Sequence, residues 1–254
     1  ARRPPRVLEA LGGSATADGG AGLARALGVR FLDAEGGDLP DGGGALERLA
    51  RIDTSRLDPR VHEAPLIACY DVANPLLGPD GAARVFGPQK GASNEQVETL
   101  ERGLTRLAER IAGDLGADVA GMPGAGAAGG TGAMLAALGA DLRPGAEVVL
   151  EALGFAGRLA DAELVITGEG KLDRQSLGGK ATVAVARACA ERLVACAAIV
   201  GESELPPGEG GFVAVRSLVE HFGDRVTALS RAEVGLRAVA SALVRALAGT
   251  GARP

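Results

Sequence analysis

Residues 163–200 read ELVITGEGKLDRQSLGGKATVAVARACAERLVACAAIV, and this stretch decides the fold. Two apolar segments, residues 164–167 and 194–200, have the length of buried strands, and a helical segment over residues 183–193 lies between them. A strand, a helix and a second strand in this order predict a βαβ unit, in which the strands are parallel and helices pack on the sheet. The stretch therefore indicates an α/β fold.

The same alternation continues toward the C-terminus. Residues 212–215 predict another short strand, and Ser230 with Glu233 forms a capping-box pattern before a final helix that reaches about Leu247. On the other side, the alternation begins only after residues 155–161. We therefore expect a domain boundary there, which divides the chain into residues 1–158 and 159–254.

In the N-terminal part, the clearest element is a helix over about residues 94–115, where apolar residues recur three or four positions apart. Ser93 and Gln96 make a capping box at its start, and Gly116 can end it. Residues 66–69 predict a short buried strand that leads into a loop, and residues 87–91 are too rich in turn residues to form regular structure.

Composition restricts the classes of function. A net charge of -5 without a basic stripe, together with 2% aromatic residues, excludes a nucleic-acid groove or a base-stacking platform. The longest apolar stretches are far below the roughly 20 residues that a membrane span requires, and no signal segment opens the chain. The three cysteines and two histidines have neither disulfide nor zinc-site spacing. We expect a cytoplasmic protein, without a membrane partner, that acts on a small molecule.

Four polar or glycine-rich loops carry the candidate chemistry. In the first, residues 12–20, the glycines, with Gly13 among them, allow close backbone approach, and Ser14 and Thr16 offer hydroxyls to an anion. Asp18 can accept a proton or reach a metal ion, although a plain turn explains these residues equally well. The second consists of Asp71 to Asn74 with Gln89 and Lys90, where the lysine can act as a point charge for an anion. A loop without a binding role explains these residues equally well.

The third loop, residues 123–132, contains a literal GxGxxG at Gly124, Gly126 and Gly129, followed by Gly130. Residues 121–123 do not make a strand, so the dinucleotide-binding fingerprint lacks its structural context. Two interpretations remain open. The loop places backbone amides at a helix N-terminus that suits an anion, or its glycines allow close helix packing.

The fourth loop, residues 167–176, leaves a buried strand at its carboxyl end, where ligands bind in open α/β sheets. Glu169 and Asp173 bracket Lys171, and these groups can hold magnesium, a phosphate and a proton. A solvated charged turn accounts for the charges equally well, but not for two carboxylates around a lysine at a strand end. Lys180 follows Gly179 without the rest of a Walker motif, so any ATP site is not a P-loop.

Taken together and in order, these loops resemble the glycerate kinase family of bacteria, in its glycerate 2-kinase type. The matching stretches are residues 12–16, 18–20, 74–79, 86–91, 123–130, 142–145 and 167–173, with Gln175 and Lys180, and they extend over nearly the whole chain. The resemblance implies two α/β domains, one inserted in the other. Residues 1–158 would form the inserted domain, and residues 159–254 the C-terminal part of a Rossmann-like domain whose N-terminal part is missing.

The resemblance also implies an ATP- and Mg²⁺-dependent transfer of a phosphoryl group to D-glycerate, giving 2-phosphoglycerate. It gives catalytic roles to Asp173, Glu169 and Lys171, with magnesium held by Glu169 and Asp173. The residues that would bind substrate or phosphate are Gly13, Ser14, Thr16, Asp18, Asp71, Asn74, Gln89, Lys90, Gly124, Gly126, Gly129, Gly130 and Lys180.

The chain also departs from the family pattern. Ala17 stands where the family usually has Asn, and Thr182 replaces a usual Pro. The Asp-Ser-Phe-Lys and Ala-Asp-Gly-Gly-Glu-Gly motifs near the family's N-terminus are missing, so we expect the sheet of residues 164–200 to have an exposed edge. Two alternatives therefore stay open: a catalytically inactive ligand-binding fragment and a kinase for a related sugar acid. A homo-oligomer also stays open.

Overall fold

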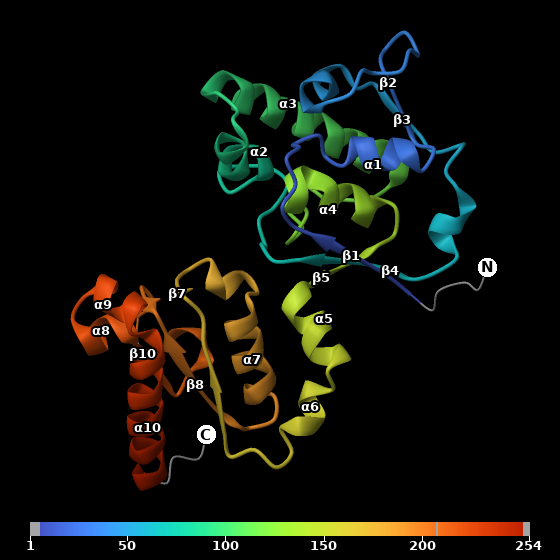
Figure 1. Ribbon diagram of the computed structural model, residues 1–254. Helices are drawn as coiled ribbons and strands as arrows, with labels where there is room; N and C mark the ends of the chain where they lie inside the picture. The colour runs from blue at the N-terminus through green and yellow to red at the C-terminus, as the bar shows by residue number, and fades with distance from the viewer. Residues whose placement is uncertain (1–5, 207, 251–254) are drawn as a thin grey trace. The chain divides into compact units, whose positions relative to one another are not determined.

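The computed structural model describes residues 6–206 and 208–250, and the chain separates into two compact units, Ala1–Gly145 and Ala146–Pro254 (Figure 1). Both units contain parallel sheets with helices packed against them, so the expected α/β class is confirmed. The division after Gly145 lies before the boundary expected near residues 155–161. That the first unit is an insertion in the second stays a prediction.

The first unit is built on a parallel sheet of three strands in the order β1-β4-β5. These strands are β1 (Val7–Leu11), β4 (Leu66–Tyr70) and β5 (Asp141–Pro144). Leu11 lies opposite Tyr70 at the carboxyl ends of β1 and β4. The loops that follow these two strands therefore begin side by side. An antiparallel pair, β2 (Arg30–Leu32) and β3 (Arg51–Asp53), completes the described strands of this unit.

The α-helices of the first unit lie on one side of this sheet (Figure 1). They are α1 (Ala21–Ala26), α2 (Ala82–Phe86), α3 (Asn94–Arg110) and α4 (Ala127–Ala137), with 3₁₀ turns η1 (Gly43–Arg48), η2 (Pro59–His62) and η3 (Pro88–Lys90) and a π-helical turn η4 (Ile111–Leu115). The segment 87–91, expected to be irregular, thus contains one 3₁₀ turn, because Pro88 fixes a helical φ at its first position.

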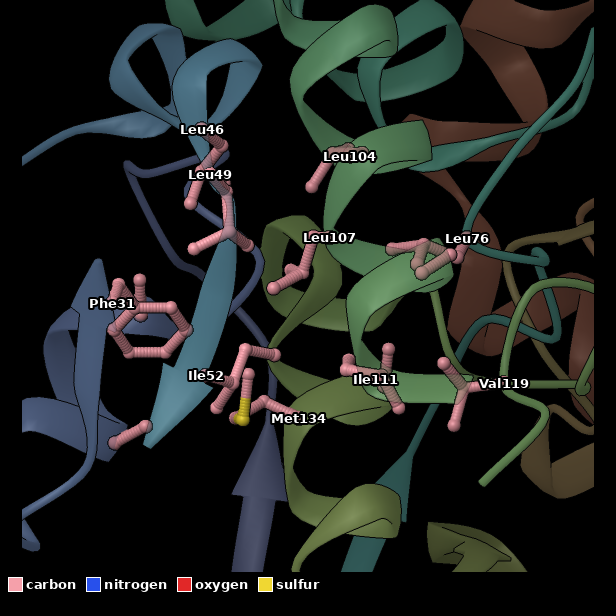
Figure 2. Close-up of a cluster of buried hydrophobic side chains, with 14 of the residues drawn as sticks. Phe31, Leu46, Leu49, Ile52, Leu76, Leu104, Leu107, Ile111, Val119 and Met134 are labelled. Carbon is pink, nitrogen blue, oxygen red and sulfur yellow. The ribbon is translucent and has the colours of Figure 1, made fainter. Parts of the chain in front are cut away.

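The helix expected over residues 94–115 is confirmed, and so is its capping box. The Ser93 hydroxyl accepts a hydrogen bond from the Gln96 amide, and the Gln96 side chain accepts one from the Ser93 amide, at 3.2 and 2.9 Å. The helix continues through η4 and stops at Gly116, whose φ of 72° is left-handed. Figure 2 shows Leu104, Leu107 and Ile111 among the side chains of the core, all of them fully buried. The regular apolar spacing thus places α3 at the centre of this unit.

The second unit contains a parallel sheet in the order β10-β8-β6, and the expected βαβ unit is confirmed. Its strands are β6 (Leu164–Thr167), β8 (Ala195–Val200) and β10 (Ala214–Ser217), with a short parallel pair, β7 (Lys171–Leu172) and β9 (Glu202–Ser203). Its helices are α5 (Gly145–Ala152), α6 (Phe155–Arg158), η5 (Ser176–Gly178), α7 (Ala181–Ala190), η6 (Glu209–Gly211), α8 (Leu218–Phe222), α9 (Arg225–Ser230) and α10 (Ala232–Thr250).

Strand β8 is buried along its whole length because helices cover both faces of the sheet. Cys196 and Ala198 pack in one cluster with Val183 of α7. Ile199 packs on the opposite side with Leu218 of α8 and with α10. This explains why β8 reads as a continuous apolar run instead of an alternating one.

Two sequence predictions at the C-terminal end need correction. The strand expected over residues 212–215 begins two residues later, since Phe212 is buried in the α7 cluster ahead of the ladder. The capping box at Ser230 and Glu233 is wrong. Ser230 is the last residue of α9, and its hydroxyl donates to the Thr227 carbonyl at 3.3 Å. The expected final helix is present as α10, which begins at Ala232, and Asp224 caps the preceding helix α9.

Candidate functional site

Lys90 joins two of the predicted loops in the first unit. Its ammonium donates hydrogen bonds to the Ser14 hydroxyl at 3.0 Å and to the Thr16 carbonyl at 2.5 Å. Burial lowers the pKa of Lys90, and the nearby charge of Asp18 offsets part of that effect. A partly desolvated ammonium beside a hydroxyl is an arrangement that favours binding of a small anion.

A pocket of about 180 Å³ lies beside this lysine. Its lining brings together six predicted site residues from loops far apart in the sequence: Gly13, Ser14, Asp71, Gln89, Lys90 and Gly129. Because the carboxyl ends of β1 and β4 lie side by side, the loops that carry Gly13 and Asp71 begin next to each other. The pocket is below the 300–1,000 Å³ that is typical of sites for drug-sized ligands. It therefore suits a small polar molecule.

Two predicted residues of this unit have structural partners instead. The Asp18 carboxylate accepts hydrogen bonds from the amides of Gly20 and Gly22, at 3.2 and 3.0 Å, and so satisfies two amides at the start of α1. The Asn74 side chain donates to the Asp80 carbonyl at 2.8 Å and so holds its own loop. Neither residue lines the pocket.

The glycine-rich loop packs closely against its neighbours. A Cβ atom at Gly126 would overlap the Pro75 carbonyl, and one at Gly124 would overlap the Tyr70 ring. Gly129 and Gly130 have φ angles of 68° and 94°, and added Cβ atoms would meet the backbone of the first loop. The geometry supports the interpretation of close packing for this loop. Of its four predicted glycines, Gly129 lines the 180 Å³ pocket.

In the second unit, Ser176 connects the two predicted carboxylates. Its side chain is completely buried, and its hydroxyl lies 3.2 Å from Glu169 Oε2 and 3.4 Å from Asp173 Oδ1. The Ser176 amide also donates to Asp173 Oδ1 at 3.1 Å. The sequence analysis did not select Ser176 as a site residue. The Asp-x-x-Ser spacing, which is typical of side chains that bond nearby backbone, is the signal that could have found it.

Lys180 supplies the positive charge of this cluster. Its ammonium lies 3.7 Å from Asp173 Oδ1 and 4.0 Å from Glu169 Oε2. Burial raises the pKa of Asp173, but the hydrogen bond from the Ser176 amide and the charge of Lys180 outweigh burial, so the pKa lies below its ordinary value. Asp173 is therefore ionised at neutral pH.

Lys171, expected to be catalytic, is not brought to this cluster. Its ammonium pairs with Glu204 at 2.6 Å, and this bond raises the pKa of Lys171. The reason is the β7–β9 pairing, which sets Lys171 opposite Glu202 and near Glu204. Lys171 thus lies between Glu169 and Asp173 in the sequence but pairs with Glu204 in the structure.

The carboxylates of Glu169 and Asp173 fit a magnesium ion. Glu169 Oε1 is a buried oxygen without a hydrogen-bond partner in the described part of the chain, which leaves a lone pair free for a cation. Residues 6–206 and 208–250 contain no cluster of three or more acidic, histidine or cysteine side chains that could hold a metal. Magnesium in phosphoryl-transfer sites is usually held by one or two carboxylates together with the substrate phosphates, so two are enough.

None of the described helices is both long and apolar enough to cross a bilayer. Residues 3–248 match the model of the glycerate kinase family. The glycerate 2-kinase of Escherichia coli strain K12 is 49% identical over 181 residues, which cover 71% of this chain and 48% of that protein. A glycerate kinase of Halalkalibacterium halodurans is 48% identical over 197 residues, which cover 77% of this chain and 52% of that protein.

A crystal structure of a Salmonella typhimurium LT2 protein assigned as glycerate kinase 2 is similar to this chain with a TM-score of 0.67 at 42% identity, covering 94% of this chain and 66% of that one. The chain spans about half the length of the curated relatives it matches. The family match extends over both units and includes every loop described above. The chain belongs to the glycerate kinase family.

Proposed function

We propose that this chain carries residues of an ATP-dependent kinase that transfers a phosphoryl group to D-glycerate and forms 2-phosphoglycerate. The observation that supports this most directly is the cluster of Glu169, Asp173, Ser176 and Lys180 at the carboxyl end of β6. Phosphoryl transfer depends mainly on positioning and on charge stabilisation, and this cluster combines carboxylates with a lysine.

Within the cluster, Glu169 and Asp173 would hold the magnesium ion. When bound, that ion neutralises phosphate charge. Lys180 lies next to both carboxylates and adds a second positive charge toward the phosphates. Ser176 fixes the side chain of Glu169 by its hydroxyl and that of Asp173 by its amide. One of the two carboxylates accepts the proton of the glycerate hydroxyl.

In the first unit, the 180 Å³ pocket is our proposed glycerate subsite. A three-carbon hydroxy acid carries one carboxylate, and Lys90 supplies the matching charge beside the Ser14 hydroxyl. Asp71 and Gln89, which also line the pocket, offer acceptors and donors to the substrate hydroxyls.

Replacing Lys90 by Met should raise KM for D-glycerate by about 10- to 100-fold, because a hydrogen bond to a charged group is worth roughly 1.5–3 kcal/mol. In the unaltered protein, KM should rise as pH rises through the lowered pKa of Lys90, since the ammonium then loses its charge. Steady-state kinetics between neutral and alkaline pH measure both effects. A K90M variant that keeps the KM and its alkaline rise would remove Lys90 from the subsite.

The proposed function is tested by an ADP-release assay with ATP, Mg²⁺ and D-glycerate. It is run on the 254-residue chain and on the longest reading frame that contains it. Turnover with D-glycerate and formation of 2-phosphoglycerate support the proposal. Turnover in neither form supports a ligand-binding fragment instead, and equal turnover with other hydroxy acids supports a kinase for a related sugar acid.

A further inference from the structure

A second, larger cavity lies in the second unit, at the carboxyl ends of β6 and β8. Its volume is about 660 Å³, within the range of sites for drug-sized ligands. The lining runs from Gly168 and Glu169 after β6, through Gly201 and Glu202 after β8, to helices α8, α9 and α10. Carboxyl ends of parallel strands are the usual place of ligands in open α/β sheets.

The lining of this cavity is divided into an apolar part and a polar part. Leu218, Ala228, Leu229 and Leu236 form an apolar wall, and the charged side chains come from the loops after β6 and β8 and from Arg225 at the start of α9. Leu229 is 72% exposed and Leu236 is 44% exposed, so the wall leaves apolar surface in water. A flat apolar ligand would remove that surface from water, at a gain of about 25 cal/mol per Å².

Backbone hydrogen bonds join the loops after β6 and β8 at this cavity. The Gly201 amide donates to the Glu169 carbonyl at 3.1 Å, and the Glu202 amide donates to the Gly170 carbonyl at 3.0 Å. A Cβ atom at Gly201 would overlap the Gly170 carbonyl, so the two loops approach as closely as glycine allows. The cavity is therefore formed before any ligand binds, which lowers the entropic cost of binding.

Four charged side chains line the cavity: Glu169, Lys171, Glu202 and Arg225. Lys171 pairs with Glu204, which lies outside the lining. Glu169 belongs both to this cavity and to the carboxylate cluster with Asp173, and its buried Oε1 lacks a hydrogen-bond partner in the described chain. Arg225 also lines the cavity, and no described carboxylate forms an ion pair with it. A ligand with an apolar part for the wall and an anionic part that binds Arg225, and Glu169 through Mg²⁺, matches this lining. The 180 Å³ pocket of the first unit is too small for such a molecule.

We propose that the 660 Å³ cavity binds the nucleoside part of the phosphoryl donor, with the purine base against the apolar wall and the phosphates toward Glu169 and Arg225. This proposal rests on the proposed kinase function and assigns the donor site within it. The purine base is the flat apolar part, and the phosphates carry the negative charge that Arg225 pairs with.

The test measures binding of adenosine, ADP and tripolyphosphate to the 254-residue chain by calorimetry, with Mg²⁺ and without glycerate. Leu229→Glu places a charge in the apolar wall and should weaken the binding of adenosine and ADP by about tenfold or more, because the bound base would remove that unpaired charge from water. Val226→Glu is the matched control, since Val226 lies on the same helix, is 77% exposed and does not line the cavity. It should change both affinities by less than about twofold.

A third variant, Arg225→Gln, should weaken the binding of ADP by about tenfold and leave the affinity for adenosine unchanged, since only the phosphates contact the guanidinium. The proposal would be overturned if Leu229→Glu left the affinity for adenosine unchanged, or if tripolyphosphate bound as tightly as ADP. Nucleoside binding with the expected losses but no phosphorylation of D-glycerate would reject the proposed function alone. Turnover in which Leu229→Glu leaves KM for ATP unchanged would reject the donor site alone.

Discussion

Asp173→Asn should lower kcat for D-glycerate phosphorylation by about 10²–10⁴-fold, the range for loss of a positioned acid–base group. The variant removes the ionised carboxylate next to Lys180 but keeps an oxygen that accepts the Ser176 amide, so the loop should stay folded. The loss should appear in kcat more than in KM for D-glycerate, because Asp173 does not line our proposed glycerate subsite at Lys90. Steady-state rates and the Mg²⁺ concentration for half-maximal rate measure it, on the form of the protein that turns over.

The control for this variant is Asp161→Asn. Asp161 is an exposed residue of the same unit and takes no part in the cluster, so its replacement by Asn should leave kcat unchanged. Glu169→Gln should behave like the Asp173 variant, since both carboxylates contact Ser176 and Lys180. Full turnover in either cluster variant would remove that residue from the proposed machinery.

Gly129→Ala should lower the free energy of unfolding by about 2–5 kcal/mol, the sum of a left-handed backbone cost and an overpacking cost. Gly129 has a φ of 68°, its carbonyl accepts a hydrogen bond from the Gly19 amide at 3.0 Å, and an added Cβ would overlap the Thr16 carbonyl. The change should therefore separate the glycine-rich loop from the first loop. Urea unfolding followed by circular dichroism measures the loss.

Gly13→Ala separates the two contributions to that loss. Gly13 has nearly the same φ, 66°, but an added Cβ meets no atom within 4 Å. It should cost only the left-handed conformation, about 1–2 kcal/mol. Equal losses in the two variants would mean that close packing against Thr16 contributes nothing, and would return the glycine-rich loop to a role in anion binding.

The fold of this chain could be predicted well where the signal is local. The apolar spacing of residues 94–110 gave α3, and its cap could be identified because Ser93 and Gln96 are three residues apart and bond each other. The strands at residues 164–167 and 195–200 were predicted because their apolar runs are short and separated by a helix. The capping box at Ser230 failed because Ser230 ends α9 and its hydroxyl bonds the Thr227 carbonyl of that helix.

The candidate site could be predicted only in part, because its contacts join residues far apart in the sequence. Lys90 meets Ser14 across 76 positions, and Lys171 turns to Glu204 through a pairing of two-residue strands. Ser176 becomes central only because η5 buries its hydroxyl between two carboxylates.

By itself, then, the sequence determined the α/β class, the main helices and strands and the resemblance to the glycerate kinase family, since periodicity, caps and ordered motifs are local patterns of residue type. Only the tertiary structure decided which polar groups of those motifs face one another and which glycines serve packing. Burial and hydrogen-bond partners depend on the path of the whole chain, and so does the charge that each carboxylate meets.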